Sequence, residues 1–425
     1  MKKQVFLILS LVTILVIACT NHEEIALTPQ QSEANNSSIR SFEEAFQIAQ
    51  SAIPIIEGST VTRGGCHRKI DLNGSKVYKL DATRGSSTAT NDTLMYIFNF
   101  ENNEGFAIVA APKNTEGLLA ITERGHFEPG TKTGIEGFDM FVDMAEEYVN
   151  RMALLPIDSL ALVLLRTRYT SHTPQAGPYI EVKWGQRYPE GEFCPNGVSG
   201  CTNTAMAQIM TYFQYPSSIN LTYDERDMDT QYLNWTNMIS HTTGHSLLEC
   251  PSYQQDTHSM IGRLCRQLGE MNNSTYVYES GTTPASTGTN TLAYAASTFA
   301  TLGYTTNPWD SIPHIDLESE LDDGHILLVR GSRSGSGHAW VLDGYTEAEY
   351  YEEIYHISGN TIIIDETFGP LYTNLYHINW GWYGMNNGYF AHNVFNTKKV
   401  IFPEGNIIFT DRNYSIGVKF LPVYR

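Results

Sequence analysis

The chain is poor in basic residues, and it lacks the motifs of several common enzyme classes. It has 27 lysines and arginines against 46 aspartates and glutamates, a formal charge of −19 over 425 residues. Such an acidic chain repels phosphate backbones, so we expect no nucleic-acid partner. No glycine-rich phosphate loop, no His-Glu-x-x-His and no Cys-x-x-Cys occurs. We therefore expect no cofactor and no metal.

Long apolar runs are scarce as well, and the one exception lies at the N-terminus. The run from Val5 to Ile17 follows two lysines and ends at Ala18-Cys19. A small residue before cysteine resembles the bacterial lipoprotein box, in which Cys19 is lipidated and residues 1–18 form the signal peptide. An ordinary cleaved signal peptide is the alternative. Either way we expect export, to the cell envelope or beyond it after processing, with membrane contact only through a lipid at Cys19.

Cysteine is also rare, and the number of cysteines bears on disulfide pairing. The six cysteines are Cys19, Cys66, Cys194, Cys201, Cys250 and Cys265. Without Cys19 the number is odd, so at least one thiol of the exported chain has no partner within the chain.

The first third of the chain has the pattern of a small α+β unit. Residues 19–38 are polar and predict a tether. Ser41 and Glu44 form a capping box ahead of an apolar helical face. Two strands, 94–100 and 106–111, flank an Asn-Asn-Glu-Gly turn, and a third follows at 117–122. A helix with an apolar face begins near Phe138 and ends near residue 156.

The middle of the chain predicts a boundary. Residues 157–168 favour a helical run, and the Thr- and Pro-containing stretch 169–178 favours an exposed linker. After residue 180 tryptophans, glycines and short strands dominate. We therefore divide the chain into residues 39–170 and residues 171–425.

The stretch "GCTNTAMAQIMTYF" places a cysteine at the beginning of a helix. Ala205, Met206, Ile209 and Met210 fall on one helical face, so the helix is buried and Cys201 lies at its N-terminal end. There the helix dipole and free N–H groups lower a thiol pKa. Cys201 is therefore either a nucleophile or half of a disulfide, for which nearby Cys194 is the natural partner.

The second half of the chain offers the other groups that a cysteine nucleophile needs. His338 follows a glycine loop at the mouth of a short apolar strand that an Asp-Gly turn closes, and it can take up the thiol proton. Asn379 and Trp380 can orient or shield an imidazole. Gln186, in Trp-Gly-Gln, can supply an oxyanion donor. Each residue alone has a structural explanation, as a buried cysteine, a strand-end histidine or a core tryptophan.

Five segments together resemble a known family. They are "EGFAIVAAPKNTEGLLAITERGHF" (104–127), "KWGQ" (183–186), "FCPNGVSGCTNTAMAQIMTYFQYP" (193–216), "GSGHAWVLDGY" (335–345) and "YHINWGWYGMNNGYF" (376–390). In these the chain resembles the streptopain family of papain-like cysteine peptidases, in the form found in Bacteroidetes-type bacteria. The resemblance implies an α+β fold, with a papain-like cysteine peptidase domain at 171–425. A small α+β pro-domain at 39–170 precedes it, blocks the cleft and is removed by proteolysis.

Carried over position by position, the resemblance implies a complete site. Cys201 is the nucleophile, His338 the general base and acid, and Gln186 the oxyanion donor, while Asn379 and Trp380 orient or shield His338. The implied function is a secreted or surface-anchored cysteine endopeptidase, made as a zymogen, which hydrolyses peptide bonds through a thiolate–imidazolium pair and an acyl-enzyme. Its partners are protein or peptide substrates and its own pro-domain.

Two departures and three alternatives complete the sequence-based account. Tyr383 stands where the family commonly has glycine, and Thr202-Asn203 where it commonly has Val-Ala. A metal hydrolase using His241, His245 and His258 is disfavoured because Gly244 interrupts the run. A serine hydrolase at 331–335 is disfavoured because that stretch has the composition of a flexible loop. The non-enzyme alternative is a catalytically silent surface lipoprotein that binds host or envelope proteins through the same cleft.

Overall fold

The computed structural model describes ten segments of the chain. They are residues 38–57, 68–79, 93–153, 165–222, 230–240, 255–312, 314–333, 336–358, 361–396 and 416–425. The expected signal peptide, Cys19 and all but residue 38 of the expected tether lie outside them, as do most of the helical run expected at 157–168, Cys66, Cys250, His241 and His245. Among the described helices, none combines the length and apolarity that a membrane crossing requires.

The N-terminal unit is the small α+β body that the sequence predicts. Its helices are α1 (Phe42–Ala52), α2 (Pro54–Glu57) and α3 (Glu136–Ala153), and its strands are β1 (Lys76–Lys79), β2 (Thr93–Asn99), β3 (Phe106–Ala110) and β4 (Leu118–Thr122). The Ser41–Glu44 capping box that begins α1 is present in both directions. Every residue of β3 and β4 is buried; α1 packs against both strands, and Phe138 of α3 contacts Phe106 of β3.

The second part begins with a strand and alternates short helices with strands. Its helices are α4 (Cys201–Phe213), α5 (Trp235–Ser240), α6 (Gln255–Met271), α7 (Thr291–Thr301), α8 (Leu317–Asp322) and α9 (His392–Phe395). Its strands are β5 (Leu165–Ala176), β6 (Ser218–Asn220), β7 (Thr230–Tyr232), β8 (Thr275–Val277), β9 (Ser286–Gly288), β10 (Thr305–Thr306), β11 (Ile326–Arg333), β12 (Ser336–Ser358), β13 (Thr361–Asn379), β14 (Gly388–Ala391) and β15 (Gly417–Tyr424).

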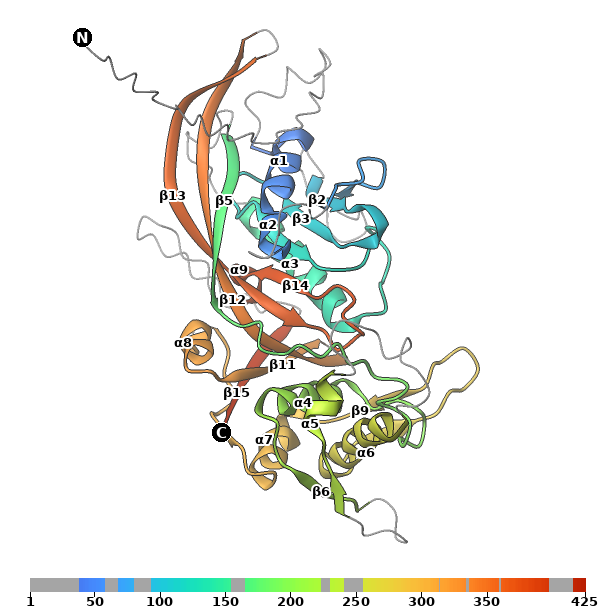
Figure 1. Cartoon of the computed structure of the whole chain (residues 1–425). Coiled ribbons are helices and arrows are strands. Elements are labelled where there is room, and N and C mark those ends of the chain that lie inside the picture. The colour runs from blue at the N-terminus through green and yellow to red at the C-terminus, as the bar shows by residue number, and fades with distance from the viewer. Residues whose placement is uncertain are drawn as a thin grey trace, which may run out of the picture.

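One sheet joins the two parts. Its strand order is β1-β2-β3-β4-β14-β13-β12-β11-β15-β10, and β5 pairs with β12 beside this path. The junction is the antiparallel pairing of β4 with β14, in which Ile121 is the partner of Tyr389. Figure 1 shows the N-terminal unit and the helices α4 to α7 at opposite ends of the molecule, with the long strands β5, β12 and β13 along one side.

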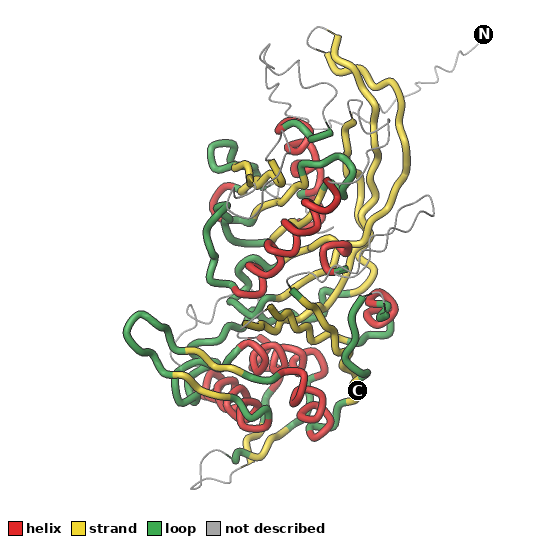
Figure 2. The backbone as a smooth tube through the Cα atoms, turned by 180° about the vertical axis from the view of Figure 1, so that it is seen from behind, coloured by secondary structure: helices red, strands yellow, loops and turns green. Residues whose placement is uncertain are grey.

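The sheet separates two hydrophobic cores. Along β11, Leu327 and Val329 belong to the core shared with α1 and α3, whereas Ile326 and Leu328 belong to the core under α4 to α7. This alternation follows from the two-residue repeat of a strand. Figure 2 shows the corresponding two groups of helices, one above the strands and one below.

The stretch expected to be an exposed linker is a strand. Residues 165–176 form β5, which pairs with β12 from Tyr345 to Ile354. Tyr169 is buried, its ring contacts Tyr350, and its N–H donates to the Ser51 hydroxyl of α1. Composition alone is misleading here, because pairing with β12 supplies the order that the Thr- and Pro-containing sequence does not specify.

The turn expected at Asp343-Gly344 is also absent. Strand β12 continues through these residues for 23 positions, with a register shift opposite β13 between Leu342 and Gly344. A Cβ at Gly344 would lie 2.6 Å from the carbonyl oxygen of Ala176. Glycine is needed there because β5 approaches closely at a bulge, and not because the chain turns.

Candidate active site

Cys201 is the first residue of α4. Gly200, at the N-cap, has φ 86° and ψ 149°, a conformation open to glycine. A Cβ at Gly200 would also lie 3.0 Å from the carbonyl oxygen of Thr287 in β9. The thiol therefore lies where unpaired helix N–H groups and the helix dipole favour an anion.

His338 lies two residues into β12, directly opposite Gly331 of β11, and is 2% exposed. Its imidazole interacts with the charge of the Cys201 thiol. The structure thus brings together two residues that lie far apart in the sequence and that the sequence selects independently.

The two groups shift each other's pKa. Burial raises the pKa of Cys201, but the charge and hydrogen bond of His338 and a hydrogen bond from the Ala339 backbone bring it below its ordinary value. Burial lowers the pKa of His338, but the Cys201 charge and the Glu136 carboxylate raise it to about 10. Both shifts favour a thiolate–imidazolium pair, the nucleophilic form of a cysteine.

The backbone around Gln186 is tied to the first turn of α4. The Gln186 carbonyl accepts from the Ser199 N–H at 2.8 Å, and the preceding Gly185 carbonyl accepts from the Thr204 hydroxyl at 3.0 Å. Gln186 itself is buried. These hydrogen bonds are made by main-chain carbonyl oxygens of the segment, and they do not involve the Gln186 side-chain amide.

Trp380 contacts His338, whereas the Asn379 side chain has other partners. The His338 Nε2 atom lies 3.4 Å from the Trp380 carbonyl oxygen. The Asn379 amide donates to the Val182 carbonyl, and its oxygen accepts from the Gln208 amide at 3.2 Å. An amide–imidazole bond of the kind expected from the sequence is thus not among the bonds that Asn379 makes here.

The N-terminal unit contributes two residues that sequence reasoning missed. Helix α3 begins at Glu136, whose Oε2 lies 3.5 Å from Nδ1 of His338. A Cβ at Gly137 would lie 2.7 Å from both the His338 ring and the Trp380 ring. Glycine in the first turn of an amphipathic helix was the available signal, since glycine often marks a close approach.

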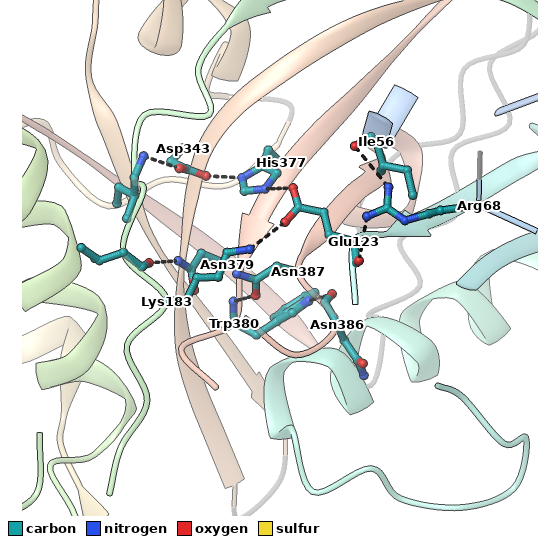
Figure 3. A network of polar contacts seen from close by, with 12 residues as sticks. Ile56, Arg68, Glu123, Lys183, Asp343, His377, Asn379, Trp380, Asn386 and Asn387 are labelled. Carbon is teal, nitrogen blue, oxygen red and sulfur yellow. Dashed lines mark hydrogen bonds and ion pairs between the residues drawn. The ribbon is translucent and has the colours of Figure 1, made fainter. Parts of the chain in front are cut away.

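A second buried histidine connects the N-terminal unit to the sheet. His377 is 4% exposed, and its Nδ1 lies 2.6 Å from Asp343. Its Nε2 lies 3.4 Å from Glu123, which also pairs with Lys183 at 3.5 Å. Figure 3 shows Glu123 between His377 and Lys183, with Asp343 on the far side of the imidazole and Asn379 nearby.

His377 and Glu123 favour each other's ionised form. Burial lowers the pKa of His377, but Asp343 and then Glu123 raise it to about 10. Burial raises the pKa of Glu123, but His377 and Lys183 bring it down to about 2. We call Glu123, Lys183, His377 and Asp343 the ionic latch, because the first belongs to the N-terminal unit and the others to the second part.

The remaining cysteines weaken the disulfide explanation. Cys194, Cys201 and Cys265 are free thiols in the structure. Burial raises the pKa of Cys194 to about 11 and raises that of Cys265 as well. Of these three thiols, Cys201 alone has a lowered pKa, so the alternative of a Cys194–Cys201 disulfide is wrong for this structure.

Comparisons with known proteins agree with this geometry. Residues 184–390 match the model of the peptidase C10 family, and residues 36–149 match that of the Spi protease inhibitor. The chain is 24% identical to streptopain of Streptococcus pyogenes over 385 residues, which cover 82% of this chain and 85% of the relative. It is 23% identical to the thiol protease/hemagglutinin PrtT of Porphyromonas gingivalis, over 86% of this chain and 43% of that protein.

A solved structure shares the fold. The Prevotella intermedia prointerpain A fragment superposes with a TM-score of 0.50 at 18% identity, over 82% of this chain and 98% of that one. This confirms the expected papain-like α+β fold with a preceding pro-domain. The chain therefore carries a streptopain-type peptidase domain of the peptidase C10 family after a pro-domain of the Spi inhibitor type, and it is a cysteine peptidase zymogen with a self-inhibiting pro-domain.

Proposed function

We propose that the chain is an exported cysteine endopeptidase in which Cys201 is the nucleophile and His338 its general base and acid. The observation that carries the proposal is the charge-coupled pair formed by Cys201, at the start of α4, and the buried His338. Its substrates are protein or peptide chains, consistent with the family of the peptidase domain.

The proposed reaction follows from the positions of these groups. The Cys201 thiolate forms a C–S bond to the scissile carbonyl carbon, and the carbonyl electron pair moves to oxygen. The Gln186 amide and the Cys201 main-chain N–H stabilise that oxyanion. The His338 imidazolium gives its proton to the leaving amine as the C–N bond breaks. Water, deprotonated by His338, then cleaves the acyl-enzyme and restores the thiolate.

We propose that Trp380 shields the imidazole and that Asn379 acts on it only indirectly, by holding β13 in place. The Trp380 carbonyl lies at His338, and its indole packs at 5.3 Å from Trp340, whose ring stacks on His338 at 6.2 Å. Asn379 joins β13 to α4 through Gln208. This linkage would keep the end of β13, and with it Trp380, in register with the nucleophile.

We propose that α3 is the part of the pro-domain that blocks the site. Its first two residues touch His338 and Trp380, and Phe138 contacts the Trp380 ring edge-on. A substrate backbone cannot occupy the same volume. The Glu136 carboxylate is a second anion beside His338. It competes with the Cys201 thiolate for the orientation of the imidazolium.

The boundary drawn from the sequence at residue 170 would cut β5 in two. Because β5 pairs with β12 along ten partner positions, we propose that activation cleavage falls on the N-terminal side of Leu165. Strand β5 would then remain with the enzyme as its first strand. The N-terminal residue of the processed enzyme tests this.

We propose further that the protein is a cell-envelope lipoprotein. Processing then determines whether the enzyme stays attached to the envelope or is released. The proposal rests on the N-terminal sequence alone, with Cys19 as the lipidated residue. Replacement of Cys19 by Ala should move the precursor out of the membrane fraction. Unchanged membrane association would contradict the lipid anchor.

The nucleophile is tested by Cys201→Ala, with Cys194→Ala as the matched control. We expect Cys201→Ala to abolish peptide hydrolysis and to leave an unconverted precursor, because the attacking group is lost. Cys194→Ala should keep substantial activity, since its buried thiol has a raised pKa. Activity of Cys201→Ala within tenfold of the unchanged enzyme would overturn the assignment.

A further inference from the structure

Tyr383, in the loop between β13 and β14, contacts the segment that carries Gln186 on both of its sides. We propose that Tyr383 is a positioning residue that holds Gln186 in place for the oxyanion. The inference rests on the oxyanion role proposed above for Gln186, and it assigns a function to a residue that takes no part in the bond-making steps.

The backbone of Tyr383 is held in an unfavourable conformation. Its φ is 55°, in the left-handed region, which bulky side chains rarely adopt. Such a conformation persists only where the surroundings determine it, and it gathers at functional sites. The contacts of Tyr383 should therefore explain why the ring lies where it does.

The ring lies flat against Gly185, the residue before Gln186. A Cβ at Gly185 would overlap three carbons of the Tyr383 ring, so only glycine allows the contact. The φ of Gly185 lies outside the left-handed region. Its lack of a side chain thus serves the approach of Tyr383 and not a turn of its own backbone.

Polar contacts extend this hold to the other side of Gln186. The Arg187 N–H donates to the Tyr383 hydroxyl oxygen at 3.0 Å, and the hydroxyl lies 3.4 Å from the Tyr188 carbonyl, to which it donates. The Tyr383 N–H lies 3.4 Å from the Trp184 carbonyl oxygen. One residue thus contacts Trp184 and Gly185 before Gln186, and Arg187 and Tyr188 after it.

The same segment is anchored to the nucleophile helix from the opposite direction. The Thr204 hydroxyl and the Ser199 N–H bind the carbonyls of Gly185 and Gln186. The fully buried Glu190 accepts from the Gly185 N–H at 2.8 Å. Burial raises the pKa of the Tyr383 hydroxyl, so it stays a donor throughout the working pH range. Gln186 is then fixed between Tyr383 and α4.

The test compares two reactions of Cys201 in Tyr383→Phe enzyme obtained by processing the full-length precursor. Peptide acylation and binding of a peptide aldehyde both need the oxyanion donor, whereas alkylation by iodoacetamide needs only the thiolate. We expect Tyr383→Phe to reduce kcat/KM and aldehyde affinity about three- to tenfold, because the hydroxyl's hydrogen bonds to Arg187 and Tyr188 are lost. Alkylation should be unchanged.

A double-mutant cycle shows whether Tyr383 acts through Gln186. In a Gln186→Ala background, which itself should lose about 10² to 10³ in acylation rate, Tyr383→Phe should have no further effect. Gly185→Ala, which displaces the ring from the other side, should reproduce the loss if Tyr383→Phe fails to fold. Tyr372→Phe, on an exposed part of β13, is the matched control and should behave as the unchanged enzyme.

The outcomes separate the two proposals. Normal acylation by Gln186→Ala would remove the oxyanion role from Gln186. Slow acylation by Gln186→Ala with normal acylation by both Tyr383→Phe and Gly185→Ala would overturn the positioning role alone. An effect of Tyr383→Phe that adds in full to that of Gln186→Ala, or that slows alkylation equally, would also overturn it.

Discussion

At the residue scale, the chemistry depends on which charges surround His338. In the precursor these are the Cys201 thiolate and the Glu136 carboxylate. Glu136 raises the pKa of His338, and it also raises the pKa of Cys201, because a nearby negative charge opposes formation of the thiolate. The pro-domain therefore changes the protonation of the pair as well as its accessibility.

We predict that Glu136→Gln in the full-length precursor shifts the alkylation profile of Cys201 to lower pH. Removal of the carboxylate lowers the pKa of Cys201, so the thiolate that reacts with iodoacetamide forms at lower pH. Alkylation rates across pH measure the midpoint. Glu147→Gln, further along α3 and paired with Arg151, is the control. An unchanged or raised midpoint for Glu136→Gln would contradict the charge coupling.

The sequence singled out Cys201 and His338, which the structure brings together, but it did not reveal all the residues that surround them. Cys201 and Gln186 occur in short motifs whose local backbone explains their position, and His338 is flanked by glycines that make it recognisable. Glu136 carries no such pattern, because its contact with His338 exists only when α3 lies on the sheet. Asn379 was recognised, but its bonds to Val182 and Gln208 depend on how distant strands meet.

At the element scale, the ionic latch joins β4 of the pro-domain to β13 and to the segment before α4. Glu123 directly follows β4, and His377 lies on β13. Burial raises the pKa of Glu123, but His377 and then Lys183 lower it from 4.5 to about 2. Its contribution to pro-domain docking is therefore present above pH 4.5 and is lost as the pH falls toward 2.

His377 sets the alkaline limit of the same contact. Its pKa rises from 6.5 to about 10, owing to Asp343 and then to Glu123. The contribution of the imidazolium is complete below pH 6.5 and is lost as the pH rises toward 10. Asp343 remains after the pro-domain leaves, so only the Glu123 share of this shift favours docking. The latch is thus strongest between about pH 4.5 and 6.5.

We predict that Glu123→Gln weakens docking and flattens its dependence on pH. The precursor should show more peptidase activity before processing, with the largest gain between about pH 4.5 and 6.5, where the latch is complete. The measurement is the peptidase activity of the precursor across pH, in an assay short enough that the precursor is not yet cleaved. Glu128→Gln, on the exposed loop before α3, is the control. Equal gains from both changes would show that the latch has no special part in docking.

Elements with a self-contained pattern were predictable, whereas those defined by a partner were not. The capping box fixes the start of α1, and the apolar spacing from Phe138 to Val149 identifies α3. Strand β5 has a linker-like composition and is ordered by β12 and α1. Strand β12 passes through Asp343-Gly344 because β5 and β13 pair with it on both sides, which no local sequence pattern expresses.

At the scale of the whole molecule, the pro-domain and the enzyme share one sheet. The β4–β14 pairing connects β1 to β4 with the strands that carry His338 and Asn379, and α3 packs into the core on one face of this sheet. We propose that activation opens this pairing and withdraws α3, while β5 stays on β12. This continuity could not be predicted from the sequence, in which the two parts appear as separate α+β units.

The most direct test of the central claim is a peptide map of the precursor treated with a thiol-reactive peptidyl ketone before and after processing. The account predicts a label on Cys201 alone, strong labelling only after pro-domain removal, and a processed chain that begins at or before Leu165. A label on another cysteine, or equally fast labelling of the intact precursor, would contradict the account.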